Sequence, residues 1–252
     1  MKRLVFAFMA AWALAASAAA ADDRVYKVAV DPDYPPFSYT DEKTGQLSGF
    51  DVDIARAVCA KLALNCDIRP VLFDDIIPQV ADGRLDIGCA GFAYTEERAR
   101  RVLFTKKYFR STNLFIGPPD AFEEVTAETL RGKKAAVQAG TIQEAYLRKT
   151  YGQVLAIIPM SGFGEVTEAV KNKTADIGFV DGLPGYSYLK SEEGLELDIV
   201  GDPVHLDSAD ACMALTPGLE PLRDRINQAI EDLRLSGEYD AINVKYFDFS
   251  VY

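Results

Sequence analysis

The chain has 252 residues, with 27 basic and 38 acidic side chains and a formal net charge of −11 at neutral pH. This length suits one large or two ordinary domains. The acidic balance argues against binding to nucleic acid or to an anionic membrane, because both carry negative charge.

Residues 1–21 have the pattern of a secretory signal peptide. Met1-Lys2-Arg3 is positively charged, an apolar run follows, and Ala19-Ala20-Ala21 offers a small-residue cleavage site. The alternative is a membrane anchor, but Leu4–Leu14 is short for a hydrocarbon core of about 30 Å. We therefore expect cleavage and export to the periplasm. Cleavage removes Lys2 and Arg3 and no acid, which changes the formal charge to −13.

Short β-rich segments alternate with helical segments along the rest of the chain, which is typical of an α/β fold with largely parallel sheets. The predicted strands are Val25–Val30, Cys66–Val71, Asp86–Phe92, Leu114–Ile116, Lys134–Val137, Val154–Ile158 and Asp176–Val180. The predicted helices are Val52–Leu62, Phe73–Ala81, Thr95–Val102, Ile142–Tyr151, Phe163–Asn172 and Leu219–Leu235. Two of these strands open with the same tripeptide, Asp86-Ile87-Gly88 and Asp176-Ile177-Gly178, and this weak repeat indicates two similar lobes.

Four cysteines suit an oxidising compartment. Cys59 and Cys66 would lie about 10 Å apart on a continuous helix, which is too far for a disulfide. A helix that ends between them, followed by a turn into the strand at Cys66, would allow the bond. Metal binding is less favoured, because the chain has no CxxC motif and a single histidine, His205.

In open α/β sheets, ligands bind beyond the carboxyl ends of the strands, where loops and helix N-termini present N–H groups. The segments at such ends are Asp31–Phe37, Gly91–Arg98, Ala139–Glu144 and Asp181–Gly182. Arg98 is the most informative residue, because a guanidinium can hold a small molecule's carboxylate through two parallel hydrogen bonds. The structural alternatives are a solvated arginine, a simple turn at Asp181, and loop packing or backbone capping for the others.

Taken in order, these segments resemble the periplasmic solute-binding proteins for polar amino acids, and most of all the histidine-binding and lysine/arginine/ornithine-binding members. The motifs that carry the resemblance cover nearly the whole chain after the signal segment. They are Asp31-Pro32 with Tyr34-x-Pro36-Phe37, Gly49-Phe50-Asp51-Val52-Asp53-Ile54-Ala55, Cys59-x6-Cys66, Phe73-Asp74-x-x-Ile77-Pro78, Thr95-Glu96-x-Arg98, Gly140-Thr141-x-Gln143-Glu144, and the tail Lys245–Tyr252.

The resemblance implies a type II periplasmic binding-protein fold, in which two α/β lobes joined by two crossovers close on a ligand. One lobe would comprise residues 22–110 and 206–252, and the other residues 111–205. The implied function is non-catalytic: a monomer without cofactor or metal would capture a polar amino acid, with a cationic one favoured, and deliver it to an inner-membrane ABC permease.

The resemblance also implies a set of ligand contacts. Arg98 would hold the α-carboxylate, helped by the N–H groups of Ala93 and Ile142, while Asp181 and the carbonyl of Gly91 would receive the α-ammonium. Tyr34 and Phe73 would flank the side chain, and Thr141 would contribute through its turn or its hydroxyl. Asp31 would face the distal end, where a carboxylate suits an ammonium, guanidinium, imidazolium or amide donor.

A second disulfide, between Cys89 and Cys212, is implied by the strands on which the resemblance places them; two buried thiols are the alternative. The chain also departs from the family at Ala90, Ala93 and Ile142, where relatives often carry hydroxyl groups. This predicts weaker binding of an ordinary amino acid or a less conventional ligand, since a hydrogen bond to a charged group contributes about 1.5–3 kcal/mol.

Two other classes of function remain open on the sequence. A periplasmic enzyme of the same fold, similar to a cyclohexadienyl dehydratase, would need a carboxylate or His205 as its general acid. The sensor lobe of a receptor is disfavoured, because no later segment has the length and apolarity of a membrane span.

Overall fold

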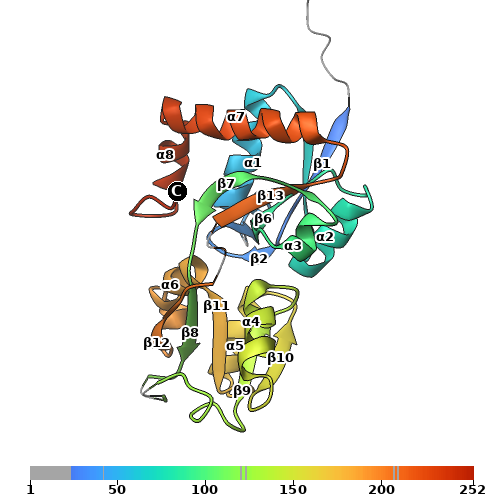
Figure 1. Ribbon diagram of the computed structural model, residues 1–252. Helices are drawn as coiled ribbons and strands as arrows, with labels where there is room; N and C mark the ends of the chain where they lie inside the picture. The colour runs from blue at the N-terminus through green and yellow to red at the C-terminus, as the bar shows by residue number, and fades with distance from the viewer. Residues whose placement is uncertain (1–23, 42, 120, 123, 207, 209) are drawn as a thin grey trace, which may run out of the picture.

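The computed structural model describes residues 24–41, 43–119, 121, 122, 124–206, 208 and 210–252. The predicted signal segment lies outside these residues. The described chain forms two lobes, each built on a five-stranded sheet (Figure 1).

The first lobe contains the sheet with strand order β5-β1-β6-β13-β7. Its strands are β1 (Val25–Val30), β5 (Asn65–Pro70), β6 (Ile87–Ala93), β7 (Leu103–Arg110) and β13 (Asp210–Leu215). Its helices are α1 (Phe50–Lys61), α2 (Phe73–Ala81), α3 (Glu96–Ala99), α7 (Glu220–Ser236) and α8 (Glu238–Asn243). A small antiparallel sheet of β2 (Asp33–Tyr34), β3 (Ser38–Thr40) and β4 (Leu47–Ser48) follows β1.

The second lobe contains the sheet with strand order β10-β9-β11-β8-β12. Its strands are β8 (Asn113–Gly117), β9 (Lys134–Gln138), β10 (Ala156–Met160), β11 (Ile177–Asp181) and β12 (Asp198–Val204). Its helices are α4 (Ile142–Tyr151), α5 (Phe163–Lys171), α6 (Gly182–Leu189) and a short 3-10 turn at Glu192–Gly194. The chain enters this lobe between β7 and β8 and leaves it between β12 and β13.

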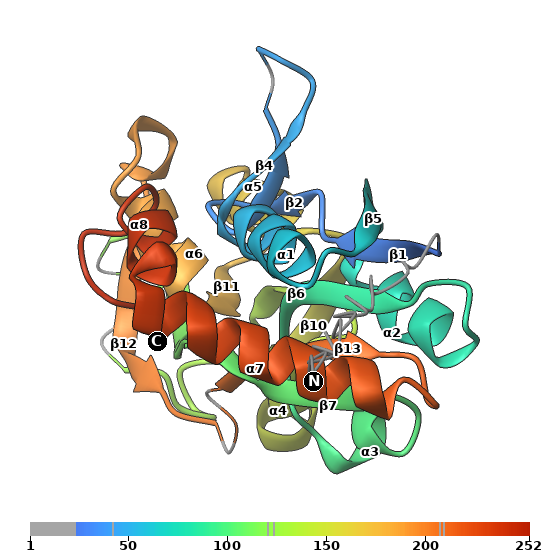
Figure 2. The same cartoon turned by 90° about the horizontal axis from the view of Figure 1, so that it is seen from above.

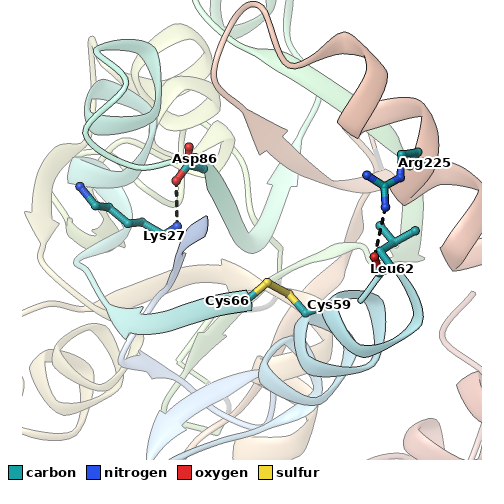
Figure 3. The surroundings of a disulfide bond; sticks show 6 residues. All are labelled: Lys27, Cys59, Leu62, Cys66, Asp86 and Arg225. Carbon is teal, nitrogen blue, oxygen red and sulfur yellow. Dashed lines mark hydrogen bonds between the residues drawn. A yellow bond between two sulfur atoms is a disulfide. The ribbon is translucent and has the colours of Figure 1, made fainter. Parts of the chain in front are cut away.

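The two sheets share one plan, which accounts for the tripeptide repeat. In each sheet three neighbouring strands are parallel and the last two are antiparallel to their neighbours. Asp86 accepts a hydrogen bond of 2.8 Å from the backbone N–H of Lys27 in β1 (Figure 3). Asp176 accepts one of 2.8 Å from Lys134 in β9. Each aspartate therefore fixes the start of one strand against its parallel neighbour.

The glycines of the repeat allow close packing of a helix on each sheet. A Cβ atom at Gly88 would lie 2.6 Å from Cγ2 of Ile76 in α2, and one at Gly178 would lie 3.2 Å from Cγ1 of Val166 in α5. Both helices rest on the strand where a side chain is missing.

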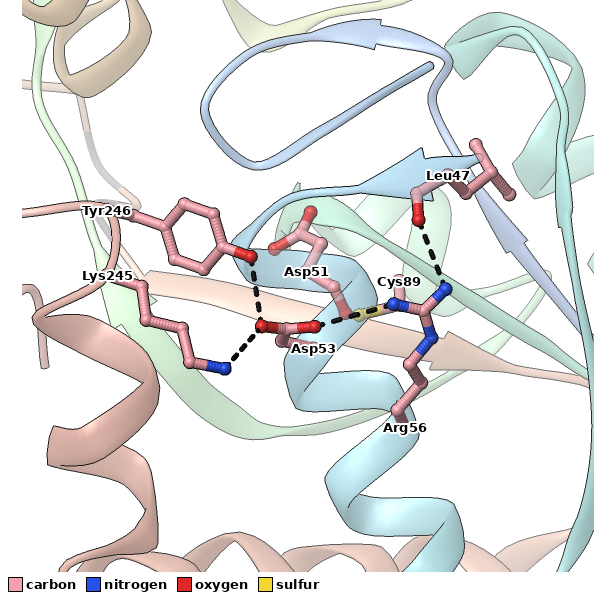
Figure 4. A network of polar contacts seen from close by, with 7 residues as sticks. All are labelled: Leu47, Asp51, Asp53, Arg56, Cys89, Lys245 and Tyr246. Atoms are coloured by element: carbon pink, nitrogen blue, oxygen red, sulfur yellow. Dashed lines mark hydrogen bonds and ion pairs between the residues drawn. The ribbon is translucent and has the colours of Figure 1, made fainter. Parts of the chain in front are cut away.

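Two motifs far apart in the sequence meet in the first lobe. Figure 2 shows α7 beside α1 and over β7. Asp53 in α1 accepts hydrogen bonds from Nζ of Lys245 at 3.0 Å and from the hydroxyl of Tyr246 at 2.9 Å (Figure 4). Nη1 of Arg56 lies 3.5 Å from the same carboxylate. The tail thus returns to the N-terminal half of the chain and closes this lobe.

The strongest periodic segments were predicted to the residue: Val25–Val30, Phe73–Ala81 and Ile142–Tyr151. The predicted helix Thr95–Val102 is a single turn, α3, after which the chain enters β7. Helix α6 (Gly182–Leu189) was not predicted, and the structural alternative given for Asp181 was a simple turn. The carboxylate of Asp181 starts this helix by accepting the N–H of Leu183.

The Cys59–Cys66 disulfide is confirmed (Figure 3). Helix α1 ends at Lys61, and the chain turns into β5 so that the two Cα atoms lie 6.3 Å apart.

The predicted Cys89–Cys212 disulfide is wrong, since both cysteines are free and buried. Along β13, Met213 packs on the side of the sheet that carries Cys89, whereas Ala214 packs in the cluster on the other side with α2. A bulge interrupts β13 between Cys212 and Ala214, so the direction of Cys212 follows from its cross-strand partner. Cys212 pairs with Phe92, which packs in the same cluster as Ala214, and it therefore points away from Cys89. The Cys89 thiol instead lies 3.5 Å from the carbonyl oxygen of Asp51.

Candidate ligand-binding site

A cavity lies between the two lobes, with about 690 Å³ of empty space including open solvent. Residues from both sheets and from the first crossover line it. Among them are eight of the nine predicted ligand contacts: Tyr34, Phe73, Gly91, Ala93, Arg98, Thr141, Ile142 and Asp181. The structure thus gathers these residues at one place, and their contact with a ligand stays a prediction.

Arg98 is held at the cavity by the end of β6 and by the second lobe. The hydroxyl of Thr95 accepts the Arg98 backbone N–H at 3.2 Å and starts α3. The guanidinium donates from Nη1 to the carbonyl of Ala93 at 2.9 Å and from Nη2 to that of Gly140 at 2.8 Å. Its carbon also lies 5.7 Å from the centre of the Phe73 ring.

Burial lowers the pKa of Arg98 to about 10, although the nearby Glu97 opposes this shift. Within the described part of the chain, no carboxylate lies within 4.0 Å of the Arg98 guanidinium. A half-buried cation without an anionic partner loses part of its hydration, and a ligand carboxylate would offset that loss.

Asp181 brings the opposite charge from the second lobe. Its Oδ1 accepts the hydroxyl of Ser111 at 2.5 Å and the N–H of Leu183 at 3.1 Å, and the Tyr34 hydroxyl is a further hydrogen-bond partner. Burial raises the pKa of Asp181 to about 6, against the effect of these hydrogen bonds. An ammonium group placed beside Asp181 would favour its charged form.

Asp31 is the one predicted ligand contact that does not line the cavity itself, and its contact with a ligand stays a prediction. Its side chain is fully buried, with an exposed fraction of 0%. One carboxylate oxygen accepts the N–H of Asp33 at 3.1 Å, and the other accepts Nε2 of Gln138 at 2.7 Å. Gln138, the last residue of β9, lines the cavity in its place. Burial raises the pKa of Asp31 to about 6, while the two hydrogen bonds act in the opposite direction.

Two hydroxyl residues that were not predicted lie at the cavity, although Ala90, Ala93 and Ile142 offer none. Ser111 and Thr112 form the crossover from β7 to β8, and both line the cavity. A pair of hydroxyl residues between two strands could have indicated this position in the sequence, but the first of those strands, β7, was not predicted. Other lining residues that were missed are Phe109, Asn113, Gln138, Gln143, Phe163, Val166, Phe179, Val180, Ser208, Asp210 and Ala211.

A series of buried hydrogen bonds fixes the backbone of Gly91 at the cavity wall. Tyr108 donates its hydroxyl to Oδ1 of Asp51 at 2.8 Å and accepts the N–H of Gly91 at 2.9 Å. Gly91 has a φ of 60°, and a Cβ there would lie 3.1 Å from the Phe109 ring. Asp51 and Cys89 come together at the start of α1 (Figure 4). Asp51, from the Gly49–Ala55 motif, thus helps to fix the backbone of Gly91 through Tyr108.

His205, the histidine that the enzyme alternative would use as a general acid, is not among the residues that line this cavity. His205 lines a different cleft, with Lys106, Tyr146 and Lys149. Among the residues whose positions are described, no group of three or more His, Cys, Asp or Glu side chains could hold a metal ion. No helix in that part of the chain is long and apolar enough to cross a membrane.

Comparison with known families places the chain. The model of the bacterial extracellular solute-binding proteins, family 3, matches residues 26–249, and the chain belongs to that family. A putative ABC transporter arginine-binding protein 2 of Escherichia coli (strain K12) is 30% identical over 98% of each chain. The histidine-binding periplasmic protein of the same organism is 27% identical over 100% of this chain and 99% of its own.

Solved structures agree with this assignment. An ancestral arginine-binding protein bound to glutamine is 30% identical, with a TM-score of 0.82 over 89% of this chain and 98% of its own. An ancestral amino acid-binding protein described as a precursor of cyclohexadienyl dehydratase is 27% identical, with a TM-score of 0.79 over 89% and 96% of the two chains. The two-lobed type II fold is therefore shown, and the curated relatives are binding proteins rather than enzymes.

Proposed function

We propose that the protein is the periplasmic substrate-binding component of an ABC transporter, which captures a polar amino acid or a close derivative between its lobes. The observation that carries the proposal is the pairing of a half-buried cation from one lobe, Arg98, with a half-buried carboxylate from the other, Asp181, in one cavity. Together they match the α-carboxylate and α-ammonium that amino acids share. The arginine- and histidine-binding relatives favour a cationic side chain.

Capture is coupled to delivery through lobe closure. A ligand that contacts both Arg98 and Asp181 has its full set of contacts only when the lobes are together, so it shifts the population toward the closed state. An inner-membrane permease that distinguishes closed from open lobes would then receive the loaded protein. We further propose that the moving units are residues 22–110 with 206–252 and residues 111–205, that the protein acts as a monomer, and that residues 1–21 direct export.

Thermal unfolding with a panel of amino acids tests this function. A ligand present at a hundred times its dissociation constant should stabilise the folded protein by about 2.7 kcal/mol. The matched control is agmatine, which keeps the side chain of arginine and lacks the α-carboxylate that Arg98 would hold. Stabilisation by no amino acid, or turnover of prephenate or arogenate, would refute the proposal.

A further inference from the structure

The N-terminus of helix α5 in the second lobe has no cap of its own. The helix begins after Gly162, which has no side chain that could accept a backbone N–H group. Helices α4 and α6 of the same lobe begin with side-chain caps, the hydroxyl of Thr141 and the carboxylate of Asp181. The first N–H groups of a helix have no partner within the helix, so those of α5 need an acceptor from elsewhere.

That acceptor comes from the other lobe. Oδ2 of Asp33, in β2 of the first lobe, accepts the N–H of Gly164, the second residue of α5, at 2.9 Å. The pairing of Asp33 with Tyr39 in β3 fixes the backbone on one side of this bond. On the other side, Phe163 is buried in the apolar cluster that also contains Tyr34 of β2. The carboxylate therefore caps α5 from the opposite lobe, where it also meets the positive end of the helix dipole.

Two glycines make room for this carboxylate. A Cβ atom at Gly162 would overlap Oδ2 of Asp33 and lie 2.9 Å from its Cβ, and one at Gly164 would lie 2.9 Å from its Oδ1. The backbone of Gly162 is extended, with a φ of −147°, and alanine adopts that conformation without strain. The missing side chain at Gly162 thus serves the contact between the lobes and not the conformation of its own segment.

This contact lies outside the ligand-binding cavity. Among the described residues that line the cavity there is neither Asp33 nor Gly162 nor Gly164. The bond from Gly164 to Asp33 exists only while β2 lies against α5, because its two ends belong to different lobes. A ligand that needs both lobes gains affinity from every contact that is made only in the closed state, including contacts that it does not touch.

We propose that Asp33 is a latch between the lobes, a positioning residue that raises the affinity for every ligand of the site by holding α5 against β2. This inference rests on the proposed function. It assigns part of the affinity to a bond between two parts of the protein, so that part is the same for all amino acids that the closed lobes accept.

Desolvation limits the size of the effect. Burial raises the pKa of Asp33, the N–H of Gly164 lowers it, and the nearby Glu165 raises it further. Closure therefore removes the carboxylate from part of its hydration, and this loss offsets part of the gain from the new bond. A hydrogen bond to a charged group corresponds to roughly a ten- to hundredfold change in affinity, and we expect the lower end of that range.

Isothermal titration of Asp33→Ala with arginine, glutamine and histidine measures the latch. The affinity for each amino acid that binds should fall by the same factor, roughly tenfold, because Asp33 touches none of them. Gly162→Ala keeps the carboxylate but blocks its approach, and it should cause a loss of similar size. Thermal unfolding without ligand is the control for folding, and Asp33→Asn is a second variant if Asp33→Ala does not fold.

Two further variants connect the loss to this one contact. Asp41→Ala removes an acid of the first lobe whose carboxylate is bonded to Thr44 in its own loop, and it should leave all affinities within about threefold of the wild-type values. The double variant of Asp33→Ala and Gly162→Ala should bind no more than about threefold more weakly than either single variant, since both changes remove the same bond.

The proposal is overturned if the affinities of Asp33→Ala stay within threefold of the wild-type values, or if the two single losses multiply in the double variant. A loss that differs by more than threefold between ligands also overturns it, because it would mean direct contact with the ligand. The proposed function has a separate readout, since it fails when no amino acid binds the wild-type protein.

In that case small-angle X-ray scattering without ligand decides on the latch. A radius of gyration larger in Asp33→Ala than in the wild-type protein would support the latch, and an equal radius would overturn it. Amino acid binding that Asp33→Ala leaves unchanged would reject the latch and keep the capture function.

Discussion

The two lobes share one architecture but bring side chains of opposite charge to the cavity between them. Strand β6 of the first lobe and β11 of the second occupy matching places in their sheets, and each begins at the isoleucine of the Asp-Ile-Gly tripeptide. The segment after β6 leads to Arg98, while β11 ends at Asp181. Strands β1 and β9 also match, and the residues at their ends are Asp31 and Gln138, which bond to each other. The shared framework therefore sets where the strand ends meet, and a few end residues set the charge presented there.

The largest expected effect is a loss of ligand affinity when the guanidinium of Arg98 in the first lobe is replaced by an ammonium group. Arg98→Lys keeps a positive charge but loses the planar fork, so affinity for an amino acid ligand should fall by roughly a hundredfold. Titration calorimetry measures the loss, and thermal unfolding without ligand serves as the control for folding. An affinity that stays within threefold of the wild-type value would remove Arg98 from its role as carboxylate clamp.

The next prediction concerns the disulfide of the first lobe and its effect on stability. The disulfide found in the described residues joins α1 to β5 in the first lobe. Replacing Cys59 and Cys66 together with serine should lower the free energy of unfolding by about 2–4 kcal/mol, because the unfolded chain gains conformational freedom. Denaturant unfolding measures this change, while ligand affinity should stay close to the wild-type value, since neither cysteine lines the cavity.

The same protein gives a check on the two free cysteines. A thiol count on the denatured, unreduced wild-type chain should return two groups, from Cys89 and Cys212. A count of zero would contradict the position of these side chains on opposite faces of the sheet.

The smallest expected effect is the loss of stability when either glycine of the repeat, Gly88 or Gly178, is replaced by alanine. Gly88→Ala should destabilise the protein by about 1–3 kcal/mol, because the new methyl group overlaps Ile76 of α2. Gly178→Ala should fall at the lower end of that range, since its methyl group would lie 3.0 Å from Ile116 and 3.2 Å from Val166. Paired denaturant titrations of the two variants measure the order. A larger loss at Gly178 would mean that the helices are not packed on the two sheets as described.

The sequence by itself determined the class of fold and predicted most of the residues that meet at the cavity. Apolar periodicity and turn residues are local signals, and they placed β1, α2 and α4 to the residue. The ordered motifs predicted roles for Arg98 and Asp181, which the structure brings to one cavity, and the helix end between Cys59 and Cys66 allowed their disulfide. Each of these conclusions depends on residues close together in the chain or on a pattern spread evenly along it.

Only the tertiary structure decided which side chains meet across the lobes and across the sheet. The direction of a strand side chain depends on register and bulges, and this is why Cys89 and Cys212 point apart although β6 and β13 are neighbours. The partner of a buried acid depends on the closure of two lobes, and so Asp31 meets Gln138, which comes 107 residues later in the chain. Contacts of this range have no local signal, because their formation follows from the packing of elements that fold separately.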